Sequence, residues 1–178
     1  VTNYQKKSSL TNSETISCDS CQTLYLELGD DKYADYAKMD IEIEDFRVAV
    51  VDGEEVMIGK PQMDVEKAGT DDFVIVIKNT SRGKTREDAR ESIEKINYTY
   101  VLKDSTLSLD PYFILGEEGK WRDQDVDITI KIPEGKSIYL EEDLVKIIHD
   151  IENVSNTWDG DMVGKFSDMK PEGLTMQG

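Results

Sequence analysis

The stretch "VDITIKI", residues 126–132, alternates apolar and polar side chains without a break. Its apolar members occupy every second position and are Val126, Ile128, Ile130 and Ile132. A period of two residues is typical of a strand with one buried and one solvated face. The stretch therefore predicts a strand whose isoleucines point into a core and whose Thr129 points to water.

The same alternation extends outward along the chain. In "LYLEL" (24–28) the leucines Leu24, Leu26 and Leu28 share one face, and "MDIEIEDFRVAV" (39–50) alternates as well. The inward positions predicted in that second stretch are Met39, Ile41 and Ile43, followed after a slip at Asp45 by Phe46, Val48 and Val50. Asp52–Gly53 then predicts a hairpin turn. Further short strands are predicted at 63–66, 73–78, 96–102, 107–109, 112–115 and 138–140.

One helix stands out, at about 85–95 in "TREDARESIEKI". Thr85 is a suitable N-cap, and acidic residues follow in the first turn, where the helix dipole favours them. Ala89, Ile93 and Ile96 form a narrow apolar stripe, which predicts an amphipathic helix lying on a sheet. The stretch "EEDLVKIIHDIENV" (141–154) fits a helix or a strand equally well.

These elements predict a mainly β fold of short strands, arranged as a twisted sandwich or a solenoid-like stack. Residues 1–21 are polar and rich in Ser, Thr and Asn, which indicates a flexible linker or arm. Residues 22–174 are predicted to form a single β-rich domain, and 175–178 a tail. The chain begins with Val1 and shows no signal-peptide layout, so we expect a fragment or a matured form of a longer protein. No apolar run reaches the ~20 residues of a membrane-spanning helix.

Charge restricts the partners of the domain. The 178 residues hold 38 acidic and 21 basic side chains, for a formal net charge of −17. Such a field repels phosphate, and nucleic-acid binding needs clustered Lys and Arg. We therefore expect no nucleic acid as a partner and no direct attachment to an anionic membrane surface.

The residues that could carry chemistry form incomplete sets. Cys18 and Cys21 have the CxxC spacing, but they follow a polar segment and precede a strand, where a redox motif would open a helix. A local disulfide and two unreactive thiols both remain open for them. Asp159 and Asp161 resemble the start of a calcium loop, yet the later ligand positions are not filled. His149 is the only histidine and lies in no catalytic motif. The sequence predicts a protein that is not an enzyme and needs no metal or cofactor.

Two features are candidate contacts for a partner. Arg82, Lys84 and Arg86 make "TSRGKTRED" (80–88) the one locally basic stretch, although it also fits a plain loop before the helix. Trp158 opens a closing segment in which Trp158, Met162, Phe166 and Met169 recur every three or four residues. We expect these four side chains to cover the end of a sheet. If the segment is instead a detachable arm, Trp158 is the leading contact residue.

Several phrases together resemble a known family. They are "SRGKTREDARESIEKINYTY", "DSTLSLDPYF", "KWRDQDVDITIKIPEGKSIYLEEDL" and "DIENVSNTWDGDMVGKFSDMKPEGL". This succession resembles the C-terminal, toast-rack region of phage-shock-protein-C (PspC) domain proteins of Gram-negative bacteria, which is related to the domains that end LiaF-type regulators. The resemblance covers residues 70–174 well and 22–70 loosely, and it contains no catalytic motif.

The resemblance implies an envelope-stress regulator with a PspC domain and membrane helices outside this chain. It implies that this domain is extracytoplasmic, on the periplasmic side of the membrane, with the cytoplasmic side as the alternative. It also implies that the domain acts by binding a protein or by self-association. Two other readings stand beside it: a secreted or surface carbohydrate-binding module, and a degenerate hydrolase. Aromatic side chains clustered on one face would favour the first, and a cleft with Asp, Glu and His149 would favour the second.

Overall fold

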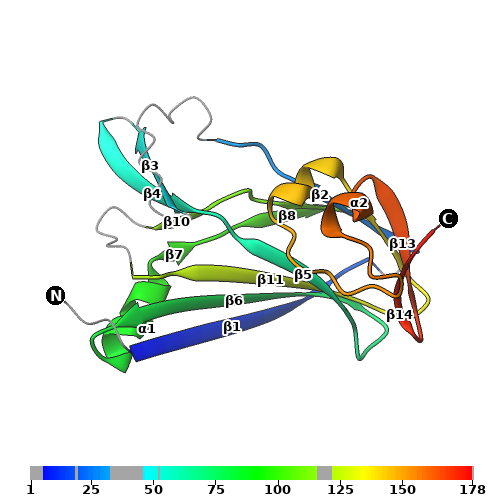
Figure 1. Ribbon diagram of the computed structural model, residues 1–178. Helices are drawn as coiled ribbons and strands as arrows, with labels where there is room; N and C mark the ends of the chain where they lie inside the picture. Colours follow the sequence, from blue (N-terminus) through cyan, green and yellow to red (C-terminus); the bar gives the residue numbers. More distant parts are fainter. Residues whose placement is uncertain (1–5, 19, 33–45, 52, 116–121, 178) are drawn as a thin grey trace.

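The computed structural model describes residues 6–18, 20–32, 46–51, 53–115 and 122–177. Most of these residues belong to strands, which within the described ranges form three sheets around a shared core (Figure 1). The predicted mainly β fold is confirmed. The predicted inward positions Met39, Ile41 and Ile43 lie outside the described residues.

A four-stranded sheet contains the stretch 126–132. Its order is β1 (Lys6–Ile16), β6 (Phe73–Gly83), β11 (Asp125–Ile132) and β5 (Gln62–Lys67). The strand β11 runs antiparallel to β6 and parallel to β5. Ile128 and Ile130 have no exposed surface, whereas Thr129 between them is partly exposed. The alternation therefore predicted this strand and its buried face correctly.

The flexible arm predicted for residues 1–21 is wrong for Lys6–Ile16, which form β1. This strand pairs antiparallel with β6 over its whole length, from Lys6 opposite Gly83 to Ile16 opposite Phe73. Only Ile16 is buried, and nearly all the other side chains are exposed. Such a strand gains backbone hydrogen bonds and little apolar burial, so it carries no hydrophobic alternation that a sequence could show.

A six-stranded sheet lies against the first. Its order is β14 (Gly173–Met176), β13 (Lys165–Lys170), β12 (Ser137–Leu140), β2 (Thr23–Leu28), β9 (Thr106–Leu109) and β8 (Tyr100–Lys103). Its three central strands, β12, β2 and β9, are parallel neighbours. The predicted tail 175–178 is wrong for Thr175 and Met176, which belong to β14 and pair with β13.

A third sheet has the order β3 (Phe46–Val51), β4 (Glu54–Gly59), β10 (Phe113–Leu115) and β7 (Ile96–Asn97). The predicted hairpin is present, with Val51 opposite Glu54 and Gly53 at a φ of +82°. The face predicted for this strand is not the buried one: Ala49 is fully buried, while Val48 and Val50 are partly exposed. Residues 48–51 are all apolar, so alternation cannot tell which face of β3 is buried.

The predicted amphipathic helix is α1 (Arg86–Glu94), which begins after the N-cap Thr85 and buries Ala89 and Ile93. The ambiguous stretch 141–154 starts as a short 3₁₀ helix, η1 (Glu142–Lys146), and continues without regular secondary structure apart from an isolated bridge between Ile148 and Met63. A second, four-residue helix, α2 (Asp159–Met162), precedes β13.

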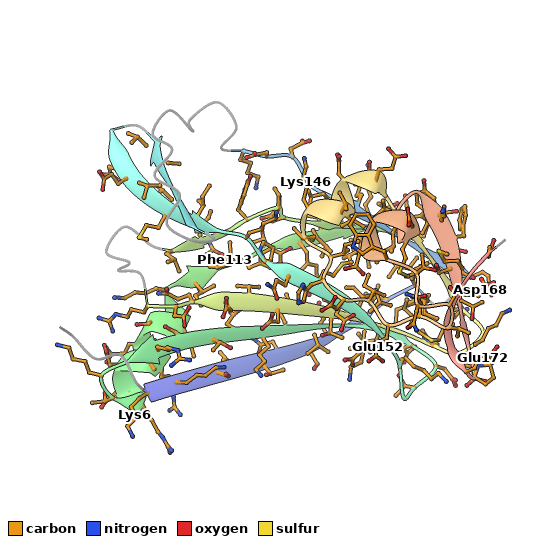
Figure 2. The ribbon with its side chains drawn as sticks, in the orientation of Figure 1. Lys6, Phe113, Lys146, Glu152, Asp168 and Glu172 are labelled. Atoms are coloured by element: carbon orange, nitrogen blue, oxygen red, sulfur yellow. A yellow bond between two sulfur atoms is a disulfide. The ribbon has the colours of Figure 1, made fainter. Side chains whose placement is uncertain are left out.

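The closing segment covers the core only in part. Met162 and Met169 are buried and join Leu174 in the core cluster. In contrast, Trp158 is 73% exposed and Phe166 is 37% exposed, so the predicted burial of these two aromatics is wrong. Figure 2 shows that Asp168 and Glu172 lie at this end of the molecule, opposite the end that carries Lys6.

Candidate functional site

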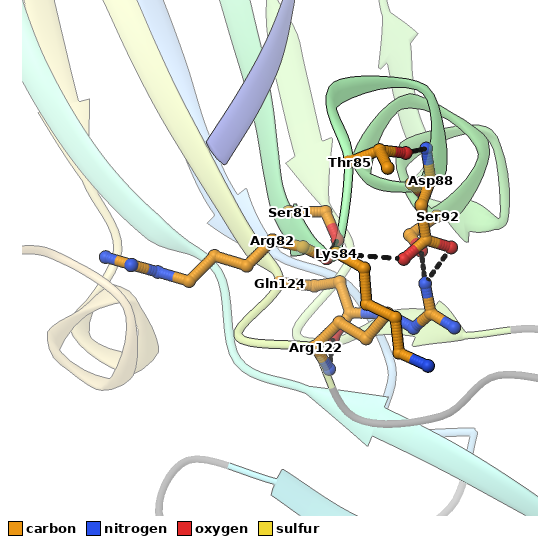
Figure 3. A network of polar contacts seen from close by, with 8 residues as sticks. All are labelled: Ser81, Arg82, Lys84, Thr85, Asp88, Ser92, Arg122 and Gln124. Carbon is orange, nitrogen blue, oxygen red and sulfur yellow. Dashed lines mark hydrogen bonds and ion pairs between the residues drawn. The ribbon is translucent and has the colours of Figure 1, made fainter. Parts of the chain in front are cut away.

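The predicted basic stretch leads into a polar network at the start of α1 (Figure 3). The backbone N–H of Asp88 donates to Thr85 Oγ1 over 3.0 Å, and the backbone N–H of Lys84 donates to Asp88 Oδ2 over 3.0 Å. Arg122 forms an ion pair with Asp88 and donates to Ser92 Oγ over 3.2 Å. The hydrogen bond from Arg122 lowers the pKa of Asp88, with the N–H of Lys84 adding to the effect. Asp88 therefore ties the loop, the helix and the chain before β11 together.

Two further residues extend this network. The buried Gln124 accepts the backbone N–H of Arg122 over 2.7 Å, and the carbonyl of Arg122 accepts the backbone N–H of Arg82 over 2.9 Å. The side chain of Arg82 points away from α1 in Figure 3, and its Nε lies 3.0 Å from Asp123 Oδ2. A Cβ on Gly83 would lie 2.5 Å from the backbone nitrogen of Ala89, so this tight approach needs glycine. The network fixes a helix start, which is a structural role.

The four predicted contact residues do not form one site. Lys84 and Arg86 are exposed at the α1 end of the molecule, and Arg82 beside them is paired with Asp123. Trp158 precedes α2, which lies at the opposite end in Figure 1. Its ring covers Gly160, where a Cβ would come within 2.4 Å of the indole. A single partner surface that contains both groups is therefore not supported by the geometry.

The carboxylate of Asp159 is engaged in a local turn. Its Oδ2 accepts the backbone N–H of Asp150 over 2.8 Å, and its Oδ1 accepts that of Ile151 over 3.0 Å. The part of the chain that the structure describes holds no group of three or more His, Cys, Asp or Glu side chains arranged for a metal ion. The imidazole of His149 is exposed, and its Nε2 lies 3.5 Å from the neighbouring Asp150.

Cys18 and Cys21 are joined in a disulfide. Of the two alternatives that the sequence left open, a local disulfide and two unreactive thiols, the structure therefore has the first. The segment that follows is held to the turn between β11 and β12: Lys136 Nζ donates to the carbonyl of Cys21 over 2.8 Å, and Gln22 Nε2 donates to that of Gly135 over 2.6 Å. A hollow of about 400 Å³ beside the disulfide is lined in part by Asp71, Asp72 and Glu134. The negative charge of these residues disfavours an anionic ligand there.

A feature that the sequence did not reveal lies on the solvent side of the six-stranded sheet. Tyr25 of β2, Tyr139 of β12 and Phe166 of β13 occupy directly opposite positions on three neighbouring strands. Their ring centroids are 5.9 Å (Tyr25–Tyr139), 4.8 Å (Tyr139–Phe166) and 6.1 Å (Tyr25–Phe166) apart. We call these three residues the aromatic row.

The aromatic row is exposed although it is apolar. Tyr25 is 39% exposed and Phe166 is 37% exposed, while the neighbouring Leu24 and Leu26 have no exposed surface. Each of the three residues stands at a wet-face position of a short alternating strand: "TLYLEL", "SIYL" and "KFSDM". The sequence signal for each of these residues is an aromatic side chain at a position where the alternation predicts a polar one. The row could not be assembled from it, because strand order is needed to bring the three together.

Comparison with known proteins adds the family. A model of the toast-rack domain found in some PspC proteins matches residues 51–177, which is more than two thirds of the chain. No curated protein and no solved structure matches the chain. Among the described helices, none is both long and apolar enough to span a membrane. From the extent of the match, together with the three-sheet β fold, the chain belongs to the toast-rack family of PspC C-terminal domains.

Proposed function

We propose that this chain is a non-enzymatic binding domain of a membrane-anchored envelope-stress protein, and that it contacts a protein partner through the aromatic row. Membership of a PspC-associated family supports the setting. The aromatic row supports the mode of action, because Tyr and Phe are enriched in the cores of protein interfaces. The row spans three strands of a rigid sheet, so little ordering is needed when a partner binds.

The surroundings of the aromatic row support a proposal for the chemistry of the partner. Glu27 lies two positions after Tyr25 on the same face of β2, and Asp168 lies two positions after Phe166 on β13. Both carboxylates are held by hydroxyl donors, from Ser108 to Glu27 and from Ser137 to Asp168. An apolar centre with fixed acidic groups beside it suits a partner that has an apolar patch with a basic rim.

An extracytoplasmic position is part of the proposal. The disulfide between Cys18 and Cys21 supports it, because disulfides persist in oxidising compartments and are rare in the cytosol. The test uses a Glu55→Cys variant of the full-length protein, because Glu55 is solvent-exposed. Intact spheroplasts that carry this variant are treated with a membrane-impermeant maleimide. We expect labelling without lysis, and labelling only after lysis would overturn this part.

Site-specific photocrosslinking tests the binding surface. A benzophenone side chain is placed at Tyr139 or Phe166 of the full-length protein in its native membrane, with Glu55 on β4 as the control position. We expect one adduct of discrete mass at both row positions and none at Glu55. Equal adducts at all three positions, or none at the row, would contradict the proposal.

The aromatic row is also the observation that favours a second candidate, a carbohydrate-binding module. The rings are inclined to one another by 46°, 52° and 83°, so they do not make a flat platform for a sugar face. Calorimetric titration with soluble cell-wall oligosaccharides separates the candidates. Heat that is lost in Tyr25→Ala and Tyr139→Ala would favour the carbohydrate module, whereas the protein-binding proposal expects no heat.

A further inference from the structure

The strand β1 is an open edge. Among the strands that the structure describes, it is the terminal one of its sheet and pairs with β6 alone, so along its 11 residues half of the backbone groups point away from the sheet. In Figure 1 it forms the lower outline of the molecule, with α1 at its Lys6 end. Exposed edges are usually blunted by proline, bulges or charges along the strand. Here Lys6–Ile16 contains no proline, its register with β6 runs one to one without a bulge, and its charges are confined to Lys6, Lys7 and Glu14, away from the middle of the strand.

The side chains of β1 are self-complementary. Lys6, Leu10 and Glu14 stand at intervals of four residues, so they share one face of the strand. Leu10, at the middle, is 50% exposed on an otherwise polar strand. Lys6 and Glu14, of opposite charge, lie at equal distances on either side of it. A strand with this pattern matches a reversed copy of itself.

We propose that β1 pairs with β1 of a second copy of this chain, antiparallel and with Leu10 on the two-fold axis. In this register Lys6 faces the partner's Glu14, Glu14 faces the partner's Lys6, and Leu10 faces the partner's Leu10. The result is one continuous eight-stranded sheet across two subunits. The edge is separate from the aromatic row, so this inference stands without the proposed function.

Symmetry leaves few other registers. Residues that lie opposite each other in an antiparallel pair share a face of the sheet. A two-fold axis normal to the sheet must therefore pass midway between one residue and the same residue of the second copy. Centring on Thr11 would place Lys6 opposite the partner's Ile16 and lose both ion pairs. Centring on Ser9 would place Lys6 opposite the partner's Asn12. The register on Leu10 alone joins the apolar pair to two ion pairs.

Local charge and local contacts favour this edge as well. The molecule carries a net charge of −17, yet β1 holds two lysines and one glutamate, with Lys78 and Arg82 beside it on β6. Repulsion between two copies is therefore weaker at this edge than the net charge of the molecule alone would give. Tyr100 donates a hydrogen bond to Glu14 Oε2, which fixes the carboxylate. Burial of Tyr100, followed by this hydrogen bond, raises the pKa of Tyr100 to about 12. The glutamate is thus held in place before a partner lysine arrives.

The first test measures mass against concentration. Sedimentation velocity of the 178-residue chain should show a monomer–dimer equilibrium with a dissociation constant below ~1 mM. Leu10→Asp places two carboxylates on the axis and should raise the dissociation constant at least about tenfold. Val154→Asp is the matched control, because Val154 is 51% exposed and lies outside β1. A wild-type chain that stays monomeric, or an unchanged Leu10→Asp dimer, would overturn the proposal.

The second test determines the register of the β1–β1 pair. It uses several variants, so its outcome does not depend on whether any single variant folds. Lys6→Glu alone and Glu14→Lys alone should each weaken the dimer, and their equimolar mixture should form a heterodimer in which every pair is again opposite in charge. Leu10→Cys should crosslink to its own copy on oxidation, whereas Thr11→Cys should not, because its copy lies two residues away along the strand, beyond the ~7 Å that a disulfide spans between Cα atoms. Preferred crosslinking of Thr11→Cys, or a mixture that stays monomeric, would contradict this pairing.

Discussion

At the scale of single residues, the centre of β11 allows a buried and a wet-face side chain to be compared by their contributions to stability. Ile130 has no exposed surface and packs in the shared core, so Ile130→Ala removes buried methyl groups and leaves a cavity. We expect a loss of ~2–5 kcal/mol in the free energy of unfolding. Thr129→Ala, one position away on the wet face, should cost less than ~1 kcal/mol. Urea unfolding of both variants measures the difference, and equal costs would mean that both faces of β11 are buried.

The lowered pKa of Asp88 predicts that the stability of the protein depends on pH. Its folded-state pKa lies below the ordinary value of 3.8, because Arg122 donates a hydrogen bond to its charged form. A lowered folded pKa means that Asp88 stabilises the fold above the unfolded pKa and that this contribution is lost as pH falls through the folded pKa. We therefore expect Asp88→Asn to destabilise the protein at about pH 7, with the difference from wild type shrinking below about pH 3. Urea unfolding midpoints at both pH values check this, and a pH-independent difference would contradict it.

At the scale of elements, the closing strands complete the six-stranded sheet. The strand β13 pairs with β12, and Met169 and Leu174 are buried in the core. Truncation after Thr157 removes β13 and β14 and exposes the edge of β12 together with its core face. We expect the truncated chain to lose its cooperative thermal transition or to aggregate. A truncated protein that melts cooperatively at the wild-type temperature would contradict this role.

The matched single substitutions in this segment separate packing from exposure. Met169→Ala should cost ~2–5 kcal/mol, because Met169 is 2% exposed. Trp158→Ala should change the free energy of unfolding by about 0.5 kcal/mol or less, because Trp158 is 73% exposed. Differential scanning calorimetry of both variants measures the contrast. A large loss from Trp158→Ala would show that its contact with Gly160 matters more than its exposure indicates.

Strand alternation and capping could predict those elements that bury one face. The strand β11 and the helix α1 are in this class, since isoleucines at every second position and Thr85 before an apolar stripe have direct physical causes. The strand β1 could not be predicted, because both of its faces are wet and its partner β6 lies far along the chain. The aromatic row depends on strand order, which local sequence does not encode, whereas the exposed Lys84 and Arg86 were recognisable from charge alone.

At the scale of the whole molecule, charge opposes compactness. The 38 acidic side chains exceed the 21 basic ones, so the folded state concentrates negative charge that the unfolded chain spreads out. Salt screens this repulsion. We expect the melting temperature to rise when sodium chloride is increased from about 10 mM to about 200 mM, as followed by circular dichroism. A fall over this range would mean that attractive ion pairs such as Arg122–Asp88 outweigh the overall repulsion.

The order of strands in the six-stranded sheet has a consequence for biosynthesis. The strand β2 leaves the ribosome well before its two neighbours, β9 and β12, which begin at Thr106 and Ser137. At roughly 5–20 residues per second, β2 waits several seconds for either of them. Throughout that wait Leu24 and Leu26 have no sheet to enter, and a nascent chain in this state is a natural client for a chaperone. Topology therefore sets this wait, since β2 has neighbours on both sides only when Ser137–Leu140 of β12 has also been made.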